Sequence, residues 1–283
     1  MTNFTRRDAL KLTAAGAVTL ALPTFALGAV KKTQPKISLQ LYSVRKDCGK
    51  DIDATMEKVA KMGYQGVEFA GYYKYGSKPK ELKKKLDSLG LVAAGTHIRT
   101  NSFIGDALKK TADFHAEIGC KYLICPGDGM FTNKEKSKEL AEIYTKAAEY
   151  LKPLGMHCGF HNHKSEFNKD GDKMYWELFA ERTPKEVVLQ LDAGWAFAAG
   201  QDPVKLIKQF PGRTGITHFK PAAHDGGKDY IGQDNRDWGA VYKACCDFGG
   251  TEWVTIEQER YPDGKSPLEC SKISLEGLKK IIG

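Results

Sequence analysis

The sequence predicts a single-domain α/β protein with a (β/α)8 barrel fold, and three observations support this prediction. About 250 residues remain after an N-terminal stretch, which is the usual size of such a barrel. Eight short apolar segments alternate with eight helical patterns, and no linker rich in Pro or Ser divides them. The unit length of roughly 30 residues is typical of one βα repeat. No Gly-rich turn follows the first strand at Tyr42, which disfavours a dinucleotide-binding fold.

The predicted elements follow one another in a regular order. The strands are expected at residues 37–42, 64–69, 91–97, 121–126, 156–163, 187–192, 214–220 and 252–258. The helices are expected at residues 51–62, 79–89, 103–118, 133–153, 172–181, 202–210, 237–248 and 267–281. Gly63, Gly90, Gly119 and Gly155 each stand between a helical pattern and the next strand. Glycine tolerates the left-handed conformation that ends a helix, so each of these residues is expected to end one.

Residues 1–29 are predicted to be an export signal of the twin-arginine type. The pair Arg6-Arg7 precedes a long uncharged stretch rich in Ala, Leu and Thr, with small residues at its end. An uncleaved membrane anchor is the alternative, but glycines and a proline interrupt the stretch, which is only weakly apolar. We therefore expect residues 30–283 to form a periplasmic barrel that has no stable membrane span in its mature form.

Charge and cysteine usage argue against a nucleic-acid-binding protein and against a small disulfide-rich protein. Removal of the signal lowers the formal net charge from +8 to about +6, and the longest remaining basic run is Lys83-Lys84-Lys85. We therefore expect no nucleic-acid partner. The seven cysteines form no CxxC pair and are odd in number, unlike a disulfide framework, although a single disulfide is left open. A homodimer is also left open.

Side chains that bind metals or move protons follow four predicted strands of the second half. These residues are His161 and His163, Asp192, His218 and Lys220, and Glu257. Taken singly, a histidine at a strand end is commonly structural, and an aspartate before Ala-Gly is commonly a turn former. Together they would lie at the C-terminal mouth of a barrel, where such enzymes keep their active sites. Burying this many ionisable groups without a metal or partner charges would be costly.

The mixture of imidazoles and carboxylates suits one divalent Mn, Co, Zn or Fe ion better than Ca, which prefers oxygen ligands alone. The sequence therefore predicts a metal-dependent enzyme. The strands of the first half also end in polar groups, which we expect to meet the substrate. These residues are Gln40 and Tyr42, Glu68, and His97 with Arg99.

Seven segments spread over nearly the whole mature chain match a known family. They are Ile37–Arg45, Gly66–Glu68, Gly159–His163 with Glu166-Phe167, Leu191-Asp192, His218–Lys220, Gly232–Trp238 and Ile256-Glu257. On these segments the chain resembles the sugar-phosphate isomerase/epimerase superfamily, the xylose isomerase-like barrels. The resemblance implies one divalent metal held by His161, Asp192, His218 and Glu257. Many members have a glutamate where His161 stands, and a histidine where Trp195 stands.

The chemistry expected from this resemblance is proton abstraction next to a carbonyl, with the metal acting as a Lewis acid that stabilises an enediolate. Glu257, His163 and Lys220 are the candidate bases. Glu68, His97, Arg99 and Glu166 are expected to hold sugar hydroxyls, with Gln40 and Tyr42 beside them. Trp195 is expected to pack against the sugar ring.

Reprotonation of the enediolate gives isomerisation or epimerisation of a sugar or keto-sugar, which is the predicted activity. Loss of a β-substituent from the same intermediate would instead make the protein a 3-keto-glycoside lyase. The export signal favours a substrate without phosphate. A non-catalytic sugar-binding barrel would keep Trp195 but need no metal. A DNA-repair endonuclease of the related barrel group would need more ligands and a basic groove, and is disfavoured.

Overall fold

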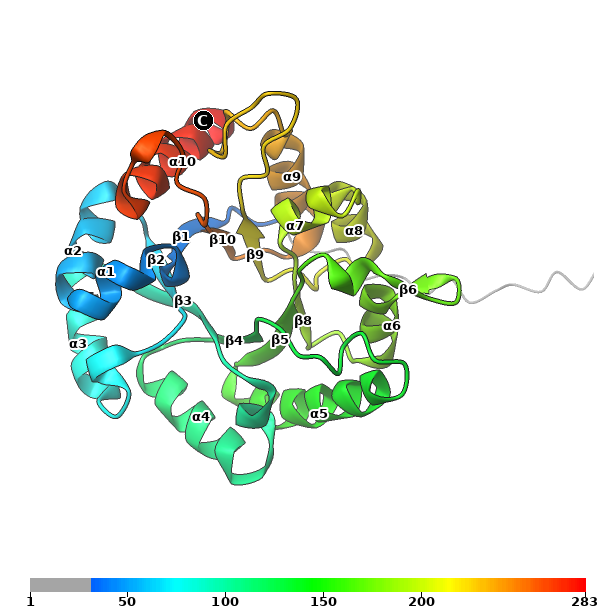
Figure 1. Cartoon of the computed structure of the whole chain (residues 1–283). Coiled ribbons are helices and arrows are strands. Elements are labelled where there is room, and N and C mark those ends of the chain that lie inside the picture. The colour runs from blue at the N-terminus through cyan, green and yellow to red at the C-terminus, as the bar shows by residue number, and fades with distance from the viewer. Residues whose placement is uncertain (1–31) are drawn as a thin grey trace, which may run out of the picture.

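The structure is a computed structural model that describes residues 32–283, so the predicted export signal at residues 1–29 lies outside the described residues. Parallel strands form the inner wall of a barrel, and helices surround them, which confirms the predicted (β/α)8 fold (Figure 1). Within the described residues, no helix is both long and apolar enough to cross a membrane.

Eight parallel strands make up the barrel wall. They are β1 (Lys36–Gln40), β2 (Gly66–Phe69), β3 (Val92–His97), β4 (Tyr122–Cys125), β5 (His157–His161), β8 (Val188–Gln190), β9 (Ile216–Phe219) and β10 (Trp253–Ile256). Hydrogen-bonded neighbours run in the order β8-β5-β4-β3-β2-β1-β10-β9. Between β8 and β9 the pairing is reduced to a parallel bridge between Asp192 and His218, with the His218 amide donating to Leu191 O at 2.9 Å. This narrow seam closes the barrel.

Ten α-helices cover the outside and the rim. They are α1 (Arg45–Lys50), α2 (Ile52–Met62), α3 (Pro79–Leu89), α4 (Gly105–Glu117), α5 (Lys136–Leu151), α6 (Tyr175–Arg182), α7 (Ala193–Ala198), α8 (Pro203–Gln209), α9 (Trp238–Ala244) and α10 (Pro267–Ile282) within residues 32–283. All eight predicted strands and all eight predicted helices are present. The glycines at 63, 90, 119 and 155 have the expected positive φ, between 66° and 91°.

The structure corrects the sequence prediction in three places. The short helices α1 and α7 were not predicted, and a hairpin of β6 (Lys169–Asp170) and β7 (Lys173–Met174) occupies the start of the predicted helix at 172–181. Asp192, which taken singly could have been a turn former, begins α7, because its side chain caps this helix by accepting from Trp195 N. The strand predicted to reach His163 ends at His161.

The lower part of the barrel interior is an apolar plug. Ala94, Tyr122, Ile124, Val188, Ile216 and Trp253 form one buried cluster there. Gly66 leaves room for the Trp253 ring, since a Cβ at this glycine would lie 2.8 Å from it. Because this plug fills the interior, the polar side chains that follow the strands are confined to the opposite, C-terminal end.

Gly194 is required for the close approach of α7 to the barrel seam. A Cβ at this position would lie 2.2 Å from Lys220 O and 2.9 Å from Lys220 Cβ. Backbone atoms cannot yield as a flexible side chain does, so any larger residue must push α7 away from β9. Gly194 therefore fixes both Asp192 and Lys220 in place.

We expect Gly194→Ala to lower the free energy of unfolding by about 1–3 kcal/mol, the usual cost of overpacking a filled site. Urea unfolding followed by circular dichroism measures the change. Gly129→Ala is the matched control, because a Cβ at Gly129 has no neighbouring atom within 4 Å. Equal losses in the two variants would contradict the close approach described above.

Candidate metal centre

Four side chains from four consecutive barrel strands meet at the C-terminal mouth. His161 ends β5, Asp192 follows β8, His218 lies in β9 and Glu257 follows β10. All four are buried, and each offers one ligand atom such that the four atoms lie within 4.8 Å of one another. The structure thus brings together the whole ligand set expected from the sequence.

The distances leave room for one ion among these atoms. Asp192 Oδ2 lies 3.9 Å from His161 Nε2 and 4.0 Å from His218 Nδ1, and Glu257 Oε2 lies 3.4 Å from His218 Nδ1. Ligands bound to Zn at about 2.0–2.2 Å are themselves separated by roughly 3–3.5 Å. Small inward movements of these side chains would therefore give a coordination shell.

Asp192 itself provides the best test of whether a metal fits. Its Oδ1 accepts from Trp195 N at 2.8 Å, whereas Oδ2 is buried and has no hydrogen-bond partner within the described residues. A buried carboxylate oxygen without a partner is costly, and such atoms call for an explanation such as an ion. The unpaired oxygen faces His161 and His218, so the residues present fit a divalent cation.

The two ligating histidines are oriented by a second layer of polar groups. Their outward nitrogens are engaged by protein: His161 Nδ1 lies 3.1 Å from Gln190 Oε1, and His218 Nε2 lies 2.5 Å from Glu68 Oε2. Such contacts fix the tautomer and direct the other nitrogen toward a metal. The other nitrogens, His161 Nε2 and His218 Nδ1, therefore face Asp192, and His218 Nδ1 also contacts Glu257 Oε2.

Gln190 connects this second layer and was not predicted from the sequence. Its Oε1 also accepts from His97 Nε2 at 2.8 Å, and its Nε2 donates to Glu68 Oε1 at 2.7 Å. Gln40 Nε2 donates to Glu68 Oε2 at 2.9 Å. Gln190 stands two residues before Asp192, and this spacing places both side chains on one face of a strand.

Burial and neighbouring charges determine the protonation of the metal-free site. Burial raises the pKa of Asp192 to about 7. Burial also disfavours the cation of His218, but the Glu68 and Glu257 carboxylates outweigh this effect and raise its pKa to about 10. Burial opposes ionisation of Glu257 as well, yet the hydrogen bond and charge of His218 lower its pKa. Since a ligating imidazole must lose its proton, a metal must displace the proton of His218.

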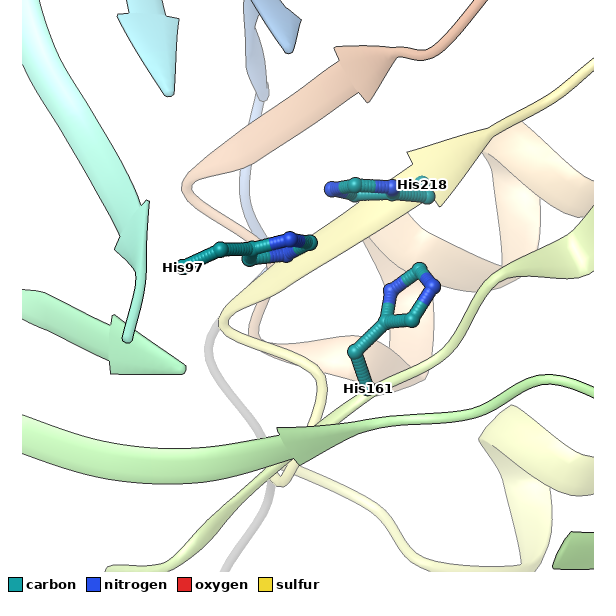
Figure 2. A group of neighbouring side chains, drawn as sticks. All are labelled: His97, His161 and His218. Carbon is teal, nitrogen blue, oxygen red and sulfur yellow. The ribbon is translucent and has the colours of Figure 1, made fainter. Parts of the chain in front are cut away.

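Three histidines cluster at the centre of the mouth (Figure 2). The His97 and His218 rings are stacked, with centroids 5.3 Å apart and planes inclined by 13°. The His161 ring lies edge-on to both. These three residues also offer nitrogens within metal-binding reach of one another. His97 Nε2, however, donates to Gln190 Oε1. We therefore do not count His97 among the four candidate metal ligands.

A cavity of about 330 Å³, which we call the metal cavity, opens above these ligands. It is lined by Tyr42, Ala70, His97, Ile98, Arg99, Pro126, His161, His163, Glu257 and Glu259. The predicted substrate residues Tyr42, His97 and Arg99 therefore share one cavity with the candidate base His163. The predicted contacts of these residues with a substrate stay predictions.

Lys220 and Trp195 lie together beside Glu257. Lys220 Nζ lies 3.6 Å from Glu257 Oε2 and 4.5 Å from the centre of the Trp195 ring, and it also pairs with Glu259. Burial disfavours the ammonium, but Glu257, Asp192 and Glu259 outweigh it and raise the pKa of Lys220. Glu259 was not predicted, although its position two residues after Glu257 is a signal for it.

Four of the predicted substrate residues do not line the metal cavity: Gln40, Glu68, Glu166 and Trp195. Gln40 and Glu68 are fully buried in the second layer, and Glu166 is 4% exposed. The Glu166 carboxylate accepts from His163 N at 2.8 Å and Ser165 Oγ at 3.0 Å.

Asn162 is a further residue that was not predicted from the sequence. It joins β5 to the seam by accepting from Asp192 N and donating to Asp192 O.

Residues 56–281 match the family described as xylose isomerase-like TIM barrel, which is most of the chain. The chain belongs to the xylose isomerase-like TIM barrel family. The matched residues include every strand from β2 to β10 and all four residues of the candidate metal centre.

Proteins similar to this xylose isomerase-like barrel include enzymes of two kinds. The chain is 22% identical over 271 residues to an inosose dehydratase of Geobacillus kaustophilus, covering 81% of this chain and 87% of the relative. A sugar phosphate isomerase/epimerase from Parabacteroides distasonis is 27% identical, with a TM-score of 0.74, and the match covers 88% of this chain and 100% of the other. An L-ribulose 3-epimerase has a TM-score of 0.69 at 15% identity over 88% of this chain and 95% of its own.

We expect Glu68→Gln to lower the pKa of His218 in the metal-free barrel, because the substitution removes the carboxylate that holds the imidazolium. Histidine NMR titration with chelator present measures this pKa, which is about 10 in the native protein. The control is Glu166→Gln, which removes a nearby negative charge bonded to His163 N and Ser165 rather than to His218. An unchanged His218 titration in Glu68→Gln would contradict the assigned contact.

Proposed function

We propose that the protein is a divalent-metal-dependent enzyme that isomerises or epimerises a sugar or keto-sugar by removing a proton next to its carbonyl. The observation that carries the proposal is the unpaired Asp192 Oδ2, which faces two oriented histidines below a cavity. Similarity to an L-ribulose 3-epimerase and to an inosose dehydratase supports chemistry at a carbon beside a carbonyl.

The metal would be one Mn, Co, Zn or Fe ion held by His161, Asp192, His218 and Glu257. When bound, it supplies a Lewis acid that stabilises negative charge developing on the carbonyl oxygen of the substrate. Both histidines are oriented by Gln190 and Glu68, so the ligand set is organised before the ion arrives. We assign Glu68 and Gln40 to this orienting layer, because neither has any exposed surface.

Among the three candidate bases, His163 is the best supported. It lines the metal cavity, and burial lowers its pKa, so the imidazole is neutral and able to accept a proton near pH 7. The pKa of Glu257 is lowered, which makes this carboxylate a weak base. Lys220 stays an ammonium because its pKa is raised, so it can donate a proton or stabilise an anion but cannot act as the base.

Elimination is the second candidate function, and Lys220 supports it. An ammonium beside the metal cavity can protonate a departing oxygen after the base has removed the proton from carbon. A dehydratase among the relatives also supports a lyase reaction. Under this proposal a 3-keto-glycoside would lose its aglycone through the same enediolate.

The substrate under either reaction is a small carbohydrate, with Trp195 packing against its ring.

We also propose that residues 1–29 direct the protein to the periplasm. The basis for this proposal is the Arg6-Arg7 pair and the uncharged stretch after it. An exported enzyme would meet free sugars and glycosides rather than phosphorylated ones.

We expect Asp192→Asn to weaken binding of Mn²⁺, Co²⁺ or Zn²⁺ by at least about a hundredfold, since even orienting residues of metal sites cost about 10–100-fold. Calorimetry on chelator-treated protein measures the affinity. Asp202→Asn is the matched control, because Asp202 caps α8 as Asp192 caps α7 but lies on the surface. A native protein that binds none of these ions near one per chain would refute the metal proposal.

We expect the metal-loaded protein to incorporate deuterium from heavy water into a keto-sugar, and His163→Gln to slow this exchange by about 10²–10⁴-fold while keeping the metal. NMR of a panel of keto-sugars and 3-keto-glycosides follows both exchange and aglycone release. His157→Gln serves as the control, since His157 starts β5 at the opposite end of the barrel. Aglycone release would favour the lyase, and no exchange or product across the panel would count against both reactions.

A further inference from the structure

A second cavity adjoins the metal cavity, and apart from Lys220 and Trp195 its lining has no role in the mechanism above. It has a volume of about 190 Å³, and we call it the side cavity. Its lining comes from α7, from the segment after β9 and from the segment after β10. Glu259 lines both cavities, and Lys220, which lines the side cavity, contacts Glu257 of the metal cavity. A substrate held at the metal could therefore extend past Glu259 into the side cavity.

The wall of the side cavity is held rigidly by a buried aspartate. Asp234 is fully buried, accepts from Ala222 N at 3.0 Å and accepts from Trp238 Nε1 at 2.9 Å. Arg236 Nε donates to Ala222 O at 2.8 Å. The Ala222 residue is thus held on both its amide and its carbonyl side, so the wall is formed before any ligand binds.

Arg236 has unused hydrogen-bonding capacity in this wall. Its guanidinium lies 4.9 Å from the centre of the Phe197 ring, and only Nε has an acceptor among residues 32–283. The other charged side chains of the side cavity are paired: Lys220 with Glu259, and Arg260 with Asp229 at 3.3 Å. Arg236 forms no ion pair with any described residue. Two free Nη groups in a fork suit a carboxylate or a phosphate.

We propose that the side cavity is a second substrate subsite that binds an anionic substituent of the sugar or of its leaving group, with Arg236 as the cation. Trp195 forms the wall between this subsite and the base His163, whose ring lies 5.5 Å from that of Trp195. The proposal rests on the proposed function for the reacting half of the substrate. The two sources of such an anion are a carboxylate, as in a uronic acid, and a phosphate ester.

Binding of three small probes to the metal-loaded full chain tests the proposal. Methyl glucuronide carries a carboxylate, glucose 6-phosphate carries a phosphate, and methyl glucoside is neutral. Trp195 fluorescence reports occupancy, because the other three tryptophans (Trp176, Trp238 and Trp253) are at most 6% exposed and Trp195 lines the cavity. Trp195→Phe should abolish the signal, and calorimetry gives the affinity independently of fluorescence.

We expect one of the two anionic probes to bind at least about tenfold more tightly than methyl glucoside, as charge-assisted pairing with a free guanidinium would give. Arg236→Gln should remove this advantage, and Arg236→Lys should restore part of it. Arg182→Gln is the matched control, since Arg182 donates to Ser137 on another part of the surface. The preferred probe distinguishes carboxylate from phosphate.

Equal affinity for the three probes, or an anion preference that survives Arg236→Gln, would overturn the subsite. Metal content and deuterium exchange measured on the same preparations separate this outcome from failure of the proposed function. An Arg236-dependent preference in a protein that lacks metal and exchange would support the subsite while refuting the proposed reaction.

Discussion

The closure of the barrel at Asp192 is the constraint on which the rest of the site depends. Asp192 forms the bridge to His218 at the seam, caps α7 through Oδ1 and leaves Oδ2 unpaired inside. A single residue thus joins β8 to β9, starts the helix that carries Trp195 and offers a metal ligand. Gly194 permits this arrangement, because only a residue without a side chain lets α7 approach Lys220 so closely.

Electrostatics at the mouth follow from excluding water from many ionisable groups at once. Glu68 and Glu257 are both buried, and they keep His218 protonated in the metal-free protein. Lys220 remains charged because three carboxylates surround it. A divalent ion would replace the proton of His218 and satisfy Asp192, so metal binding and proton release are linked. Burial, by contrast, lowers the pKa of His163 and leaves it as the neutral imidazole that lines the metal cavity.

The polar residues at the strand ends have different roles in the first and second halves of the barrel. In the proposed metal site, residues at the ends of β5, β8, β9 and β10 would hold the ion, whereas Gln40 and Glu68 from the first two strands would orient the ligands from below. Tyr42 and Arg99 remain at the surface of the metal cavity, where a sugar would meet them. His161 stands where many members of the family have a glutamate. Its contact with Gln190 fixes the tautomer of the imidazole, so this histidine also has an orienting residue below it.

The sequence by itself determined the barrel, its alternating strands and helices, and the four polar residues that meet at its mouth, because each depends on local signals. The alternation of strands and helices, the glycines that end helices and the polar residues that follow apolar strands can each be recognised from a few neighbouring residues. The tertiary structure alone decided which polar residues reach the cavity. Gln190 and Asn162 have their roles because they contact residues of strands that lie far apart in sequence. Glu68 is buried against His97 and His218, and Gln40 is buried against Glu68. α7 also escaped prediction, since one aspartate followed by Ala-Gly reads as a turn until the packing against Lys220 extends it into a helix.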